Sequence, residues 1–406
     1  MLFFTETTNL AGCISRLYPK PTYADFVRYK NLLRLFGKTF NATGCFFASS
    51  PGRVEIVGNH TDHNGGKVIG CCVNKDIIAA FSPTNNGVVT VKSPHYQDIR
   101  FHVKSVFRKE FGSSGMAKGV IAYLVNQGYK IGGFDCIIHS ALPVGAGISS
   151  SAAFQLLLGN IVNALYNDGT IPSEVLAKAG QFAENEYFNK PCGLLDQGVI
   201  ATGGMVAIDF ANGFCCERLP CKLSGVDIVL INTGKSHASL TDHYAAIPAE
   251  MKQVARYFGK TRLADVDKEL FFVDSDKVAA NLGLRPMLRA KHFFEECEIV
   301  DEMKSALRAD NTDAVLRLVN KSGNSSIEQL QNCSVYGDDS VLQAVLFARS
   351  ICPSCASRVH GGGFAGTVLC LVPHEHTRDF VAKSSLRYGE GNVMTLLPRE
   401  QPSTVL

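Results

Sequence analysis

The chain has 406 residues, of which 46% are hydrophobic and 19% charged, and its formal net charge is +3. This length exceeds what a single hydrophobic core usually serves, so two domains or lobes are expected. The near-balanced charge gives no reason to expect nucleic acid or an anionic membrane as a partner. No stretch approaches the roughly 18 uninterrupted apolar residues of a membrane-spanning helix, so the sequence predicts a soluble globular protein.

The N-terminus and the cysteines point to the cytoplasm. The first residues lack a basic region and reach Glu6 before an apolar run is established, so no secretory signal is predicted. The 14 cysteines are therefore expected to stay reduced and to act mainly as small hydrophobic residues. Cys352 and Cys355 have the C-x-x-C spacing of metal and redox motifs, but no second pair follows to complete a zinc site. A structural role is favoured for them.

The first half mixes strand patterns with turns and then becomes helical. Residues 67–81 are β-rich and apolar, 88–93 alternate, and 134–141 form a short apolar run, so all three are predicted strands. A Gly- and Ser-rich segment then leads into a helix that ends near Tyr166. A second helix is predicted over 173–188, with Ser173 as its N-cap.

The second half is mostly helical between short strands. The predicted strands are 203–210, 226–233, 367–372 and 393–397, and the predicted helices are 241–258, 286–308, 313–320 and 340–350. Strands and helices mix without regular alternation, which favours an α+β fold over a doubly wound sheet. The weakest join lies between residues 211 and 226, so we predict two domains, 1–215 and 216–406.

Residues 143–153 have the composition of a phosphate-binding turn. Gly145 and Gly147 allow close approach of the backbone to a ligand, and three serines follow at the mouth of a helix, Ser149, Ser150 and Ser151. Exposed N–H groups and the helix dipole would make an anion cradle suited to a triphosphate. The lysine of a P-loop is missing, and a serine replaces the third glycine of a dinucleotide fingerprint. A capped strand-to-helix turn is the plain structural alternative.

Residues 50–66 concentrate polar side chains between glycines. Arg53, His60 and Asp62 lie there with two asparagines and a second histidine, a density suited to a polyhydroxylated ligand. His60 and Asp62 are also possible metal ligands, but no third ligand stands at a familiar spacing. A polar loop without a ligand remains the alternative.

Residues 183–197 carry two carboxylates of interest. Glu184 is predicted to lie on a helix that ends near Pro191, and a glycine-containing turn then presents Asp196. A carboxylate in this setting is often only a surface group. If Asp196 pairs with Arg53 in a cleft, it can instead orient or deprotonate an attacking hydroxyl.

These segments, in this order, resemble the galactokinase family of the GHMP kinase superfamily. The family signature G-R-x-N-x-I-G-E-H-x-D-Y-N-x-G is matched by Gly52, Arg53, Gly58, His60, Asp62, Asn64 and Gly66. The phosphate loop P-x-G-x-G-L-S-S-S-A is matched almost entirely by residues 143–152, and the E-N-x-Y-F-x-x-x-C-G-x-x-D-Q block by 184–197. Residues 358–366 resemble the C-terminal GHMP motif.

The resemblance implies a two-lobed GHMP kinase fold with the active site between the lobes. The N-terminal lobe would be of the ribosomal protein S5 domain 2-like type, and the C-terminal lobe ferredoxin-like. The implied activity is ATP-dependent phosphorylation of galactose at its anomeric hydroxyl. The expected partners are ATP, Mg²⁺ and a small sugar, without nucleic acid or membrane, in a monomer or weak homodimer.

The resemblance also implies a role for each matched residue. Asp196 would position or deprotonate the anomeric hydroxyl, and Arg53 would hold Asp196 ionised and offset charge on the transferring phosphoryl group. Mg²⁺ would be bound by Ser151 and Glu184. The nucleotide would be bound by Gly145, Gly147, Ser149, Ser150, Ser151 and Lys118. The sugar would be bound by Asn59, His60, Asp62, Gly193 and Tyr244.

Departures from the family pattern affect the substrate prediction. Asn59 stands where the family usually has Glu, Glu55 where it has Asn, and His63 where it has Tyr. Losing a charged acceptor at position 59 would weaken galactose binding by about 1–3 kcal/mol and would remove a repulsion against a C6 carboxylate. Galacturonate is therefore the alternative substrate. An inactive sugar sensor would be expected to lose part of the serine loop or Asp196, and both are present.

Overall fold

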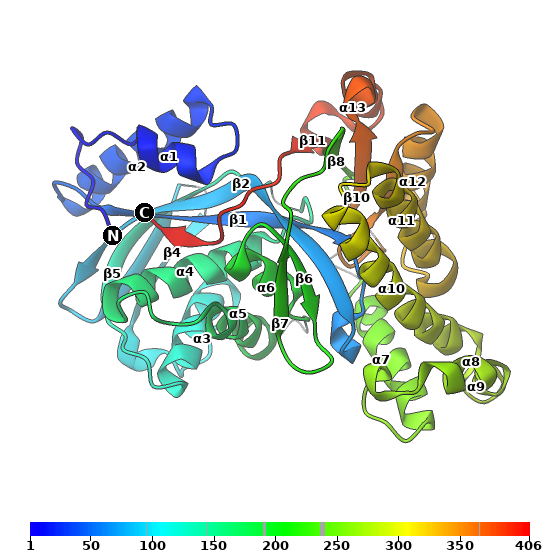
Figure 1. The fold of residues 1–406 in the computed structure, drawn as a ribbon. Helices are drawn as coiled ribbons and strands as arrows, with labels where there is room; N and C mark the ends of the chain where they lie inside the picture. The colour runs from blue at the N-terminus through cyan, green and yellow to red at the C-terminus, as the bar shows by residue number, and fades with distance from the viewer. Residues whose placement is uncertain (95, 144, 190–191, 236–239, 365) are drawn as a thin grey trace.

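The computed structural model describes residues 1–406 except 95, 144, 190–191, 236–239 and 365. Its described strands form two sheets, one of eight strands and one of four. Helices cover the faces of both sheets, without a regular βα alternation along the chain (Figure 1). The predicted α+β class is confirmed.

The larger sheet is built almost entirely from the first 219 residues. Its strands are β1 (Phe46–Val57), β2 (Lys67–Thr84), β3 (Val88–Ser93), β4 (Tyr96–His102), β5 (Gly133–Ser140), β6 (Met205–Asp209), β7 (Cys215–Leu219) and β12 (Thr404–Val405). The order is β12-β1-β2-β5-β3-β4, while β6 pairs with β2 and with β7. The β3–β5 pair is parallel, and the other pairs are antiparallel.

Two helical layers enclose the larger sheet. One face packs on α1 (Ala11–Leu17) and α2 (Tyr23–Phe40), through a buried cluster that includes Tyr29, Phe36 and Phe47. The other face packs on α3 (Gly112–Asn126), α4 (Ser150–Tyr166), α5 (Ser173–Phe182) and α6 (Leu195–Thr202). Because both faces are covered, β1 and β2 are buried along most of their length, including polar residues such as Arg53 and Glu55.

The smaller sheet has the order β11-β8-β10-β9. Its strands are β8 (Val226–Asn232), β9 (Ala356–His360), β10 (Thr367–Pro373) and β11 (Val393–Leu396). The helices of this part are α7 (Thr241–Tyr257), α8 (Lys268–Val273), α9 (Ser275–Leu282), α10 (Leu284–Arg308), α11 (Thr312–Ser325), α12 (Ser340–Ile351) and α13 (His374–Tyr388). Helices α12 and α13 pack on the smaller sheet. Helix α11 contacts β9 of this sheet and β1 of the larger one, and α10 packs on α11 and on β1 and β2. In the described residues, no helix is both long and apolar enough to cross a bilayer.

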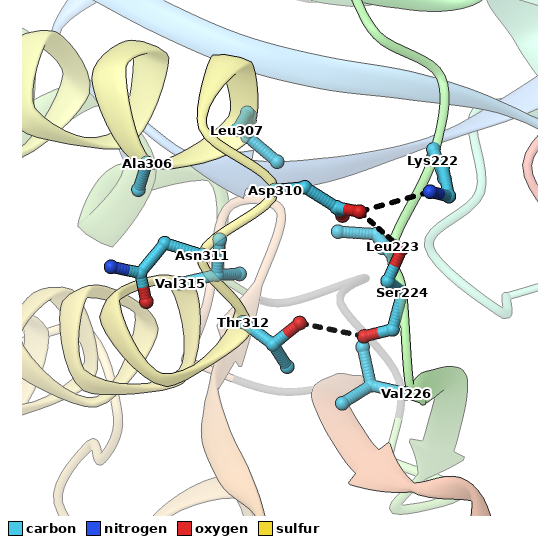
Figure 2. A pocket seen from close by; sticks show the side chains of 10 residues that line it. All are labelled: Lys222, Leu223, Ser224, Val226, Ala306, Leu307, Asp310, Asn311, Thr312 and Val315. Atoms are coloured by element: carbon cyan, nitrogen blue, oxygen red, sulfur yellow. Dashed lines mark hydrogen bonds and ion pairs between the residues drawn. The ribbon is translucent and has the colours of Figure 1, made fainter.

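Residues 220–225, which join the two sheets, are hydrogen-bonded to the turn between α10 and α11. Asp310 in that turn accepts hydrogen bonds from the Lys222 ammonium and the Ser224 hydroxyl, each at 2.9 Å (Figure 2). Thr312 Oγ1 donates to the Ser224 carbonyl at 2.7 Å. These contacts fix the path of the chain from β7 into β8.

Several elements differ from the sequence predictions for local reasons. The predicted helix 173–188 is α-helical only to Phe182 and continues as a π-helical turn, η3 (Ala183–Tyr187). Its N-cap is Pro172 rather than Ser173. Asp196 lies in the first turn of α6, not on a free turn. Strand β7 occupies part of segment 211–226, the predicted weakest join.

A buried ion cluster joins the two ends of the chain to the larger sheet. Asp76 on β2 is fully buried and accepts hydrogen bonds from Arg28 of α2 at 2.9 Å and from Arg399 at 3.1 Å. Ser49 and Tyr18 donate to the same carboxylate. Burial alone would raise the pKa of Asp76, but the two arginines and the hydroxyl donors hold it below its usual value.

Replacing Asp76 with Asn should lower the free energy of unfolding by about 3–5 kcal/mol, because the buried Arg399 and the largely buried Arg28 lose their counter-charge. Urea titration followed by circular dichroism measures this change. The matched control is Asp98→Asn, which breaks an exposed pair with Lys92 and should cost no more than about 1 kcal/mol. Equal effects of the two substitutions would contradict the structural importance of the Asp76 cluster.

Candidate active site

Arg53 brings three parts of the site together. It lies on β1 with 5% of its surface exposed, and its Nε and Nη2 atoms lie 2.8 and 2.6 Å from Asp196 Oδ1. Its Nη1 donates to the carbonyl of Gly147 at 2.7 Å. The Asp196 side chain keeps 33% exposure, so it remains accessible to a ligand. The pairing of Arg53 with Asp196, which the sequence alone left open, is therefore present.

The phosphate loop bends back toward this ion pair. Ser149 is the residue before α4 and has the left-handed backbone conformation, with φ 59°. Its hydroxyl donates to Asp196 Oδ2. Gly147 has φ +71°, and a Cβ there would lie 3.1 Å from Thr367 Oγ1 and 3.3 Å from His360 Nδ1. Glycine therefore lets the loop pass close to the smaller sheet, while the first N–H groups of α4 remain available to an anion.

Ser151 and Glu184 form the predicted metal pair. Ser151 Oγ lies 3.2 Å from Glu184 Oε1, and Glu184 is 3% exposed within the π-helical turn. Gln155 donates to the second oxygen at 3.0 Å. Among the described residues, no three His, Cys, Asp or Glu side chains are grouped as a metal cage. A hydroxyl and a carboxylate suit Mg²⁺, which is usually held by one or two carboxylates together with substrate phosphates.

Lys118 lies apart from the phosphate loop in its described contacts. It is almost fully buried in α3, where its ammonium pairs with Glu110 and lies 5.5 Å from the centre of the Phe101 ring. It also approaches the carbonyl of Arg108 at 3.5 Å. Its assignment to the nucleotide stays a prediction.

Three of the predicted sugar residues meet on one glycine triplet. Asn59 Nδ2 donates to the carbonyl of Gly361 at 2.7 Å, and Tyr244 Oη donates to that of Gly363 at 2.7 Å. His60 Nε2 lies 2.9 Å from the Gly362 carbonyl, so this nitrogen carries the proton. Nδ1 of His60 is then a buried acceptor with no partner in the described part of the chain.

The other two predicted sugar residues line a cavity. Asp62 and Gly193 are among the walls of a space of about 360 Å³, which is within the range of small-molecule sites. A Cβ at position 193 would lie 1.6 Å from Asp62 Oδ2, so any larger residue there would displace this carboxylate. The further lining residues are His63, Lys178, Gln181, Cys192, Leu194, Phe210, Gly213 and Phe214.

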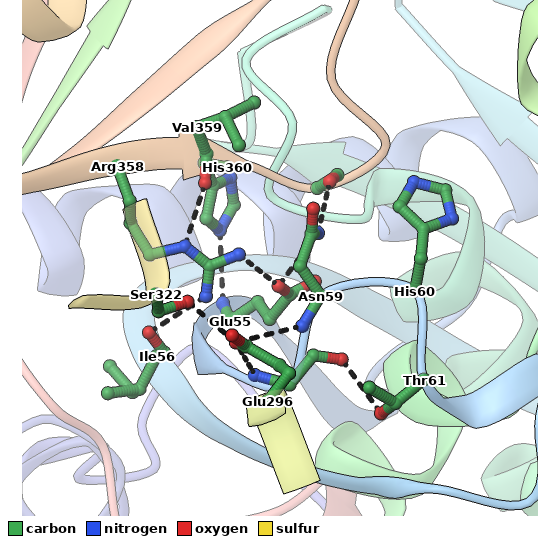
Figure 3. A network of polar contacts seen from close by, with 12 residues as sticks. Glu55, Ile56, Asn59, His60, Thr61, Glu296, Ser322, Arg358, Val359 and His360 are labelled. Carbon is green, nitrogen blue, oxygen red and sulfur yellow. Dashed lines mark hydrogen bonds and ion pairs between the residues drawn. The ribbon is translucent and has the colours of Figure 1, made fainter. Parts of the chain in front are cut away.

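A buried polar network contacts residues 50–66, the segment predicted to bind the sugar. The sequence patterns did not predict this network. Arg358 on β9 is fully buried and pairs with Glu55 on β1 at 2.7 Å, and Asn59 donates to the same Glu55 oxygen at 2.9 Å (Figure 3). The Glu55 N–H donates to His360 Nε2 at 3.0 Å. Two residues of α10, His292 and Glu296, contact the backbone at residues 58–59. Their spacing of four on a helix places them on one face, which is the only signal that sequence offered.

Burial keeps the histidines of the site neutral. It lowers the pKa of His60 to about 4, and the neighbouring His63 adds to this effect. Burial likewise lowers the pKa of His292, and it lowers that of His360 well below its usual value, with Arg53 and Arg358 contributing. Burial raises the pKa of Glu55 despite the opposing effect of Arg358.

Comparison with known families gives two matches within the chain. Residues 34–83 match the galactokinase galactose-binding signature, and residues 115–204 match the GHMP kinases N terminal domain. The first range contains Arg53 and the sugar segment, and the second contains the phosphate loop and Asp196.

Curated relatives and solved structures agree with these matches. The chain is 27% identical over 369 residues to a galactokinase of Clostridium tetani, covering 89% of this chain and 91% of the relative. It is 28% identical over 376 residues to a galactokinase of Bacillus subtilis, covering 89% and 94%. The crystal structure of Lactococcus lactis galactokinase complexed with galactose superposes with a TM-score of 0.82 at 25% identity, over 93% of this chain and 99% of that one. A mevalonate kinase of Methanococcus jannaschii, 16% identical with a TM-score of 0.62 over 87% of this chain and 98% of that one, shares the fold.

The stability of the protein should fall as the pH drops from about 6.5 toward 4. In this window the unfolded chain binds protons at positions 60, 292 and 360, while the folded protein, whose histidine pKa values are lowered, does not. Each such histidine adds a slope of up to about 1.4 kcal/mol per pH unit. Urea titrations at several pH values measure the slope. His292→Gln should flatten it, the exposed control His376→Gln should not, and a pH-independent stability would contradict the assignment.

Proposed function

We propose that this member of the GHMP kinase superfamily is an ATP-dependent sugar-1-kinase that converts galactose and ATP to galactose 1-phosphate and ADP. The observation that carries the proposal is the Arg53 guanidinium, which bonds the Asp196 carboxylate and the Gly147 carbonyl of the phosphate loop at the same time. A group that accepts a proton and a loop that binds phosphate are thereby held side by side. The galactokinase relatives support galactose as the acceptor.

In the proposed reaction, Asp196 orients the anomeric hydroxyl and accepts its proton as the oxygen attacks the γ-phosphorus of ATP. The bond from that phosphorus to the bridging oxygen of ADP breaks, and ADP leaves. Arg53 keeps Asp196 in place and offsets charge on the transferring group. Such a reaction asks mainly for positioning and charge stabilisation, which a buried and fixed guanidinium supplies. The Ser149 hydroxyl, which donates to Asp196 here, would turn to a phosphate oxygen.

Mg²⁺ would be held by Ser151 and Glu184 and would neutralise charge on the nucleotide phosphates. Gln155 donates to Glu184 and fixes its orientation. We assign the phosphate oxygens to the N–H groups from Gly145 to Ser151. Lys118 is kept in the nucleotide site as a proposal that rests on the family resemblance alone.

The sugar would occupy the cavity beside Asp62 and Gly193. His60 and Tyr244, which do not line this cavity, are kept as sugar contacts on the family resemblance. The Asp62 carboxylate would accept hydrogen bonds from sugar hydroxyls, and the absence of a side chain at Gly193 leaves room for that carboxylate. The unpartnered Nδ1 of His60 is a further acceptor.

The setting of the enzyme completes the proposal. We place it in the cytoplasm, supported by its 14 free cysteines. The predicted division at residue 215 would cut off β7, which pairs within the larger sheet, so we divide the chain between β7 and β8. Strand β12 and residues 398–403 return to the larger sheet and belong with it.

Asp196→Ala should lower kcat by about 10²–10⁴-fold, the usual contribution of a positioned general base. Asp379→Ala, at an exposed carboxylate on α13, is the matched control and should leave kcat unchanged. Initial rates of ADP formation with Mg²⁺ measure both, and circular dichroism checks the fold. If turnover survives the loss of Asp196, the roles given to the site residues are wrong.

Galactose should be the preferred acceptor in a panel with galacturonate, N-acetylgalactosamine, arabinose and glucose. The readout is kcat/KM for each sugar at saturating ATP and Mg²⁺. A tenfold preference for another sugar, about 1.4 kcal/mol in transition-state binding, would retain the chemistry and replace the substrate. Absence of turnover with every sugar would favour a sugar sensor.

A further inference from the structure

Helix α10 contacts the loop that precedes His60 through two side chains one turn apart. Glu296 Oε1 accepts hydrogen bonds from the backbone N–H of Gly58 at 2.8 Å and of Asn59 at 3.4 Å. His292 Nε2 lies 2.9 Å from the carbonyl oxygen of Asn59 and therefore donates to it. The N–H groups of Gly58 and Asn59 and the carbonyl of Asn59 are thus all bound by one helix.

Both side chains are fully buried and are fixed from behind by α11. The Ser322 hydroxyl donates to Glu296 Oε1 at 2.6 Å (Figure 3). The Ser325 hydroxyl lies 2.7 Å from His292 Nδ1, which accepts because Nε2 is protonated. A buried carboxylate is costly unless hydrogen bonds compensate its lost hydration. Here the compensation falls on Oε1, which accepts from the two loop N–H groups and from Ser322, while Oε2 is buried without a partner among the described residues. Helix and loop therefore stabilise each other's position through Oε1.

The bound segment has a backbone that needs such support. Gly58 has φ +105°, and a Cβ there would lie 2.5 Å from the Cα of Val68. His60 has φ 59°, a left-handed conformation in a residue that is not glycine. Such conformations cost about 1–3 kcal/mol and persist where surrounding contacts determine them.

The Asn59 side chain is fully used by protein contacts. Its Nδ2 donates to Glu55 and to the Gly361 carbonyl, and its Oδ1 accepts from Asn332 at 2.8 Å. With its backbone groups bound by α10, every polar group of Asn59 has a protein partner. Asn59 therefore acts on a ligand through the shape of the loop, and not by direct contact.

We propose that Glu296 and His292 are positioning residues that set the backbone of residues 58–60 and thereby the affinity for the sugar. This inference rests on the proposed function, because the proposed function assigns His60 and Asp62 to the sugar site. Both residues follow residues 58–59, which α10 binds. The hydrogen bonds of Glu296 and His292 go to the backbone of residues 58–59 and to two serines of α11, Ser322 and Ser325. Loss of the contacts made by Glu296 and His292 should therefore weaken sugar binding more than ATP binding.

The test compares Glu296→Met, Glu296→Gln and the matched control Glu295→Gln. Glu295 is adjacent on α10 and bonds Gln329 instead of the loop. Removing the acceptor leaves two buried N–H groups unpaired, so Glu296→Met should raise the KM for galactose about tenfold. The KM for ATP should stay within about twofold. Glu296→Gln should restore most of the affinity, because one amide oxygen can accept both N–H groups.

Amide hydrogen exchange gives a readout that does not depend on catalysis. Glu296→Met should raise the exchange rate in peptides that cover residues 56–62 by about tenfold, and Glu295→Gln should not. If Glu296→Met does not fold, Ser322→Ala removes only one donor to the carboxylate and should give the same pattern with a change of about threefold.

The proposal is overturned if exchange in residues 56–62 and the sugar KM both match the wild type. It is also overturned if sugar and ATP are affected equally while the melting temperature falls, since that marks a purely structural role. Failure of the proposed function looks different, because the wild-type protein would then phosphorylate none of the sugars. In that case the exchange measurement still decides whether α10 holds the loop.

Discussion

The guanidinium of Arg53 is the contact on which the rest of the site depends. It projects from the buried strand β1 and bonds the first turn of α6 and the apex of the phosphate loop. A planar guanidinium has fixed donor directions and little freedom once bonded. The separation of Asp196 from the phosphate loop is therefore set by one side chain that is anchored in the larger sheet. The proposed roles of the serines at the start of α4 and of the cavity beside Asp62 both depend on that fixed geometry.

Around this contact, the two sheets meet through buried polar groups. Arg358 of the smaller sheet pairs with Glu55 of the larger one, and His360 accepts the N–H of the same residue. Buried ion pairs often add little to stability compared with apolar packing, because their desolvation is costly. Here they define how the two sheets are arranged, because a displacement of one sheet against the other would leave Arg358 and Glu55 unpaired. Strand β1, residues 58–60 and the triplet Gly361–Gly363 are fixed relative to one another by these buried contacts.

Sequence patterns predicted the parts of this molecule that are local. The glycines and serines of residues 145–151 predicted a phosphate loop because their chemistry and spacing are contained in one turn. The resemblance to galactokinases then placed Asp196 and Arg53 in one site. The break in the helix at Ala183 was not predictable, because a π-helical turn leaves no periodic signal, and it turns Glu184 toward Ser151. The contacts of α10 with residues 58–59 were also missed, because they join segments separated by more than 230 residues. Asn59 was assigned to the sugar by its position in the motif, whereas its polar groups are bound by Glu55, Gly361, Asn332 and α10.

The proposed activity, transfer of a phosphoryl group from ATP to the anomeric oxygen of a sugar, is tested by ³¹P NMR of the product that the intact protein forms from galactose, ATP and Mg²⁺. The expected product is a phosphate coupled to the anomeric proton, together with one equivalent of ADP. A phosphate coupled to the C6 protons, or ADP formed without any sugar phosphate, would contradict the proposed activity.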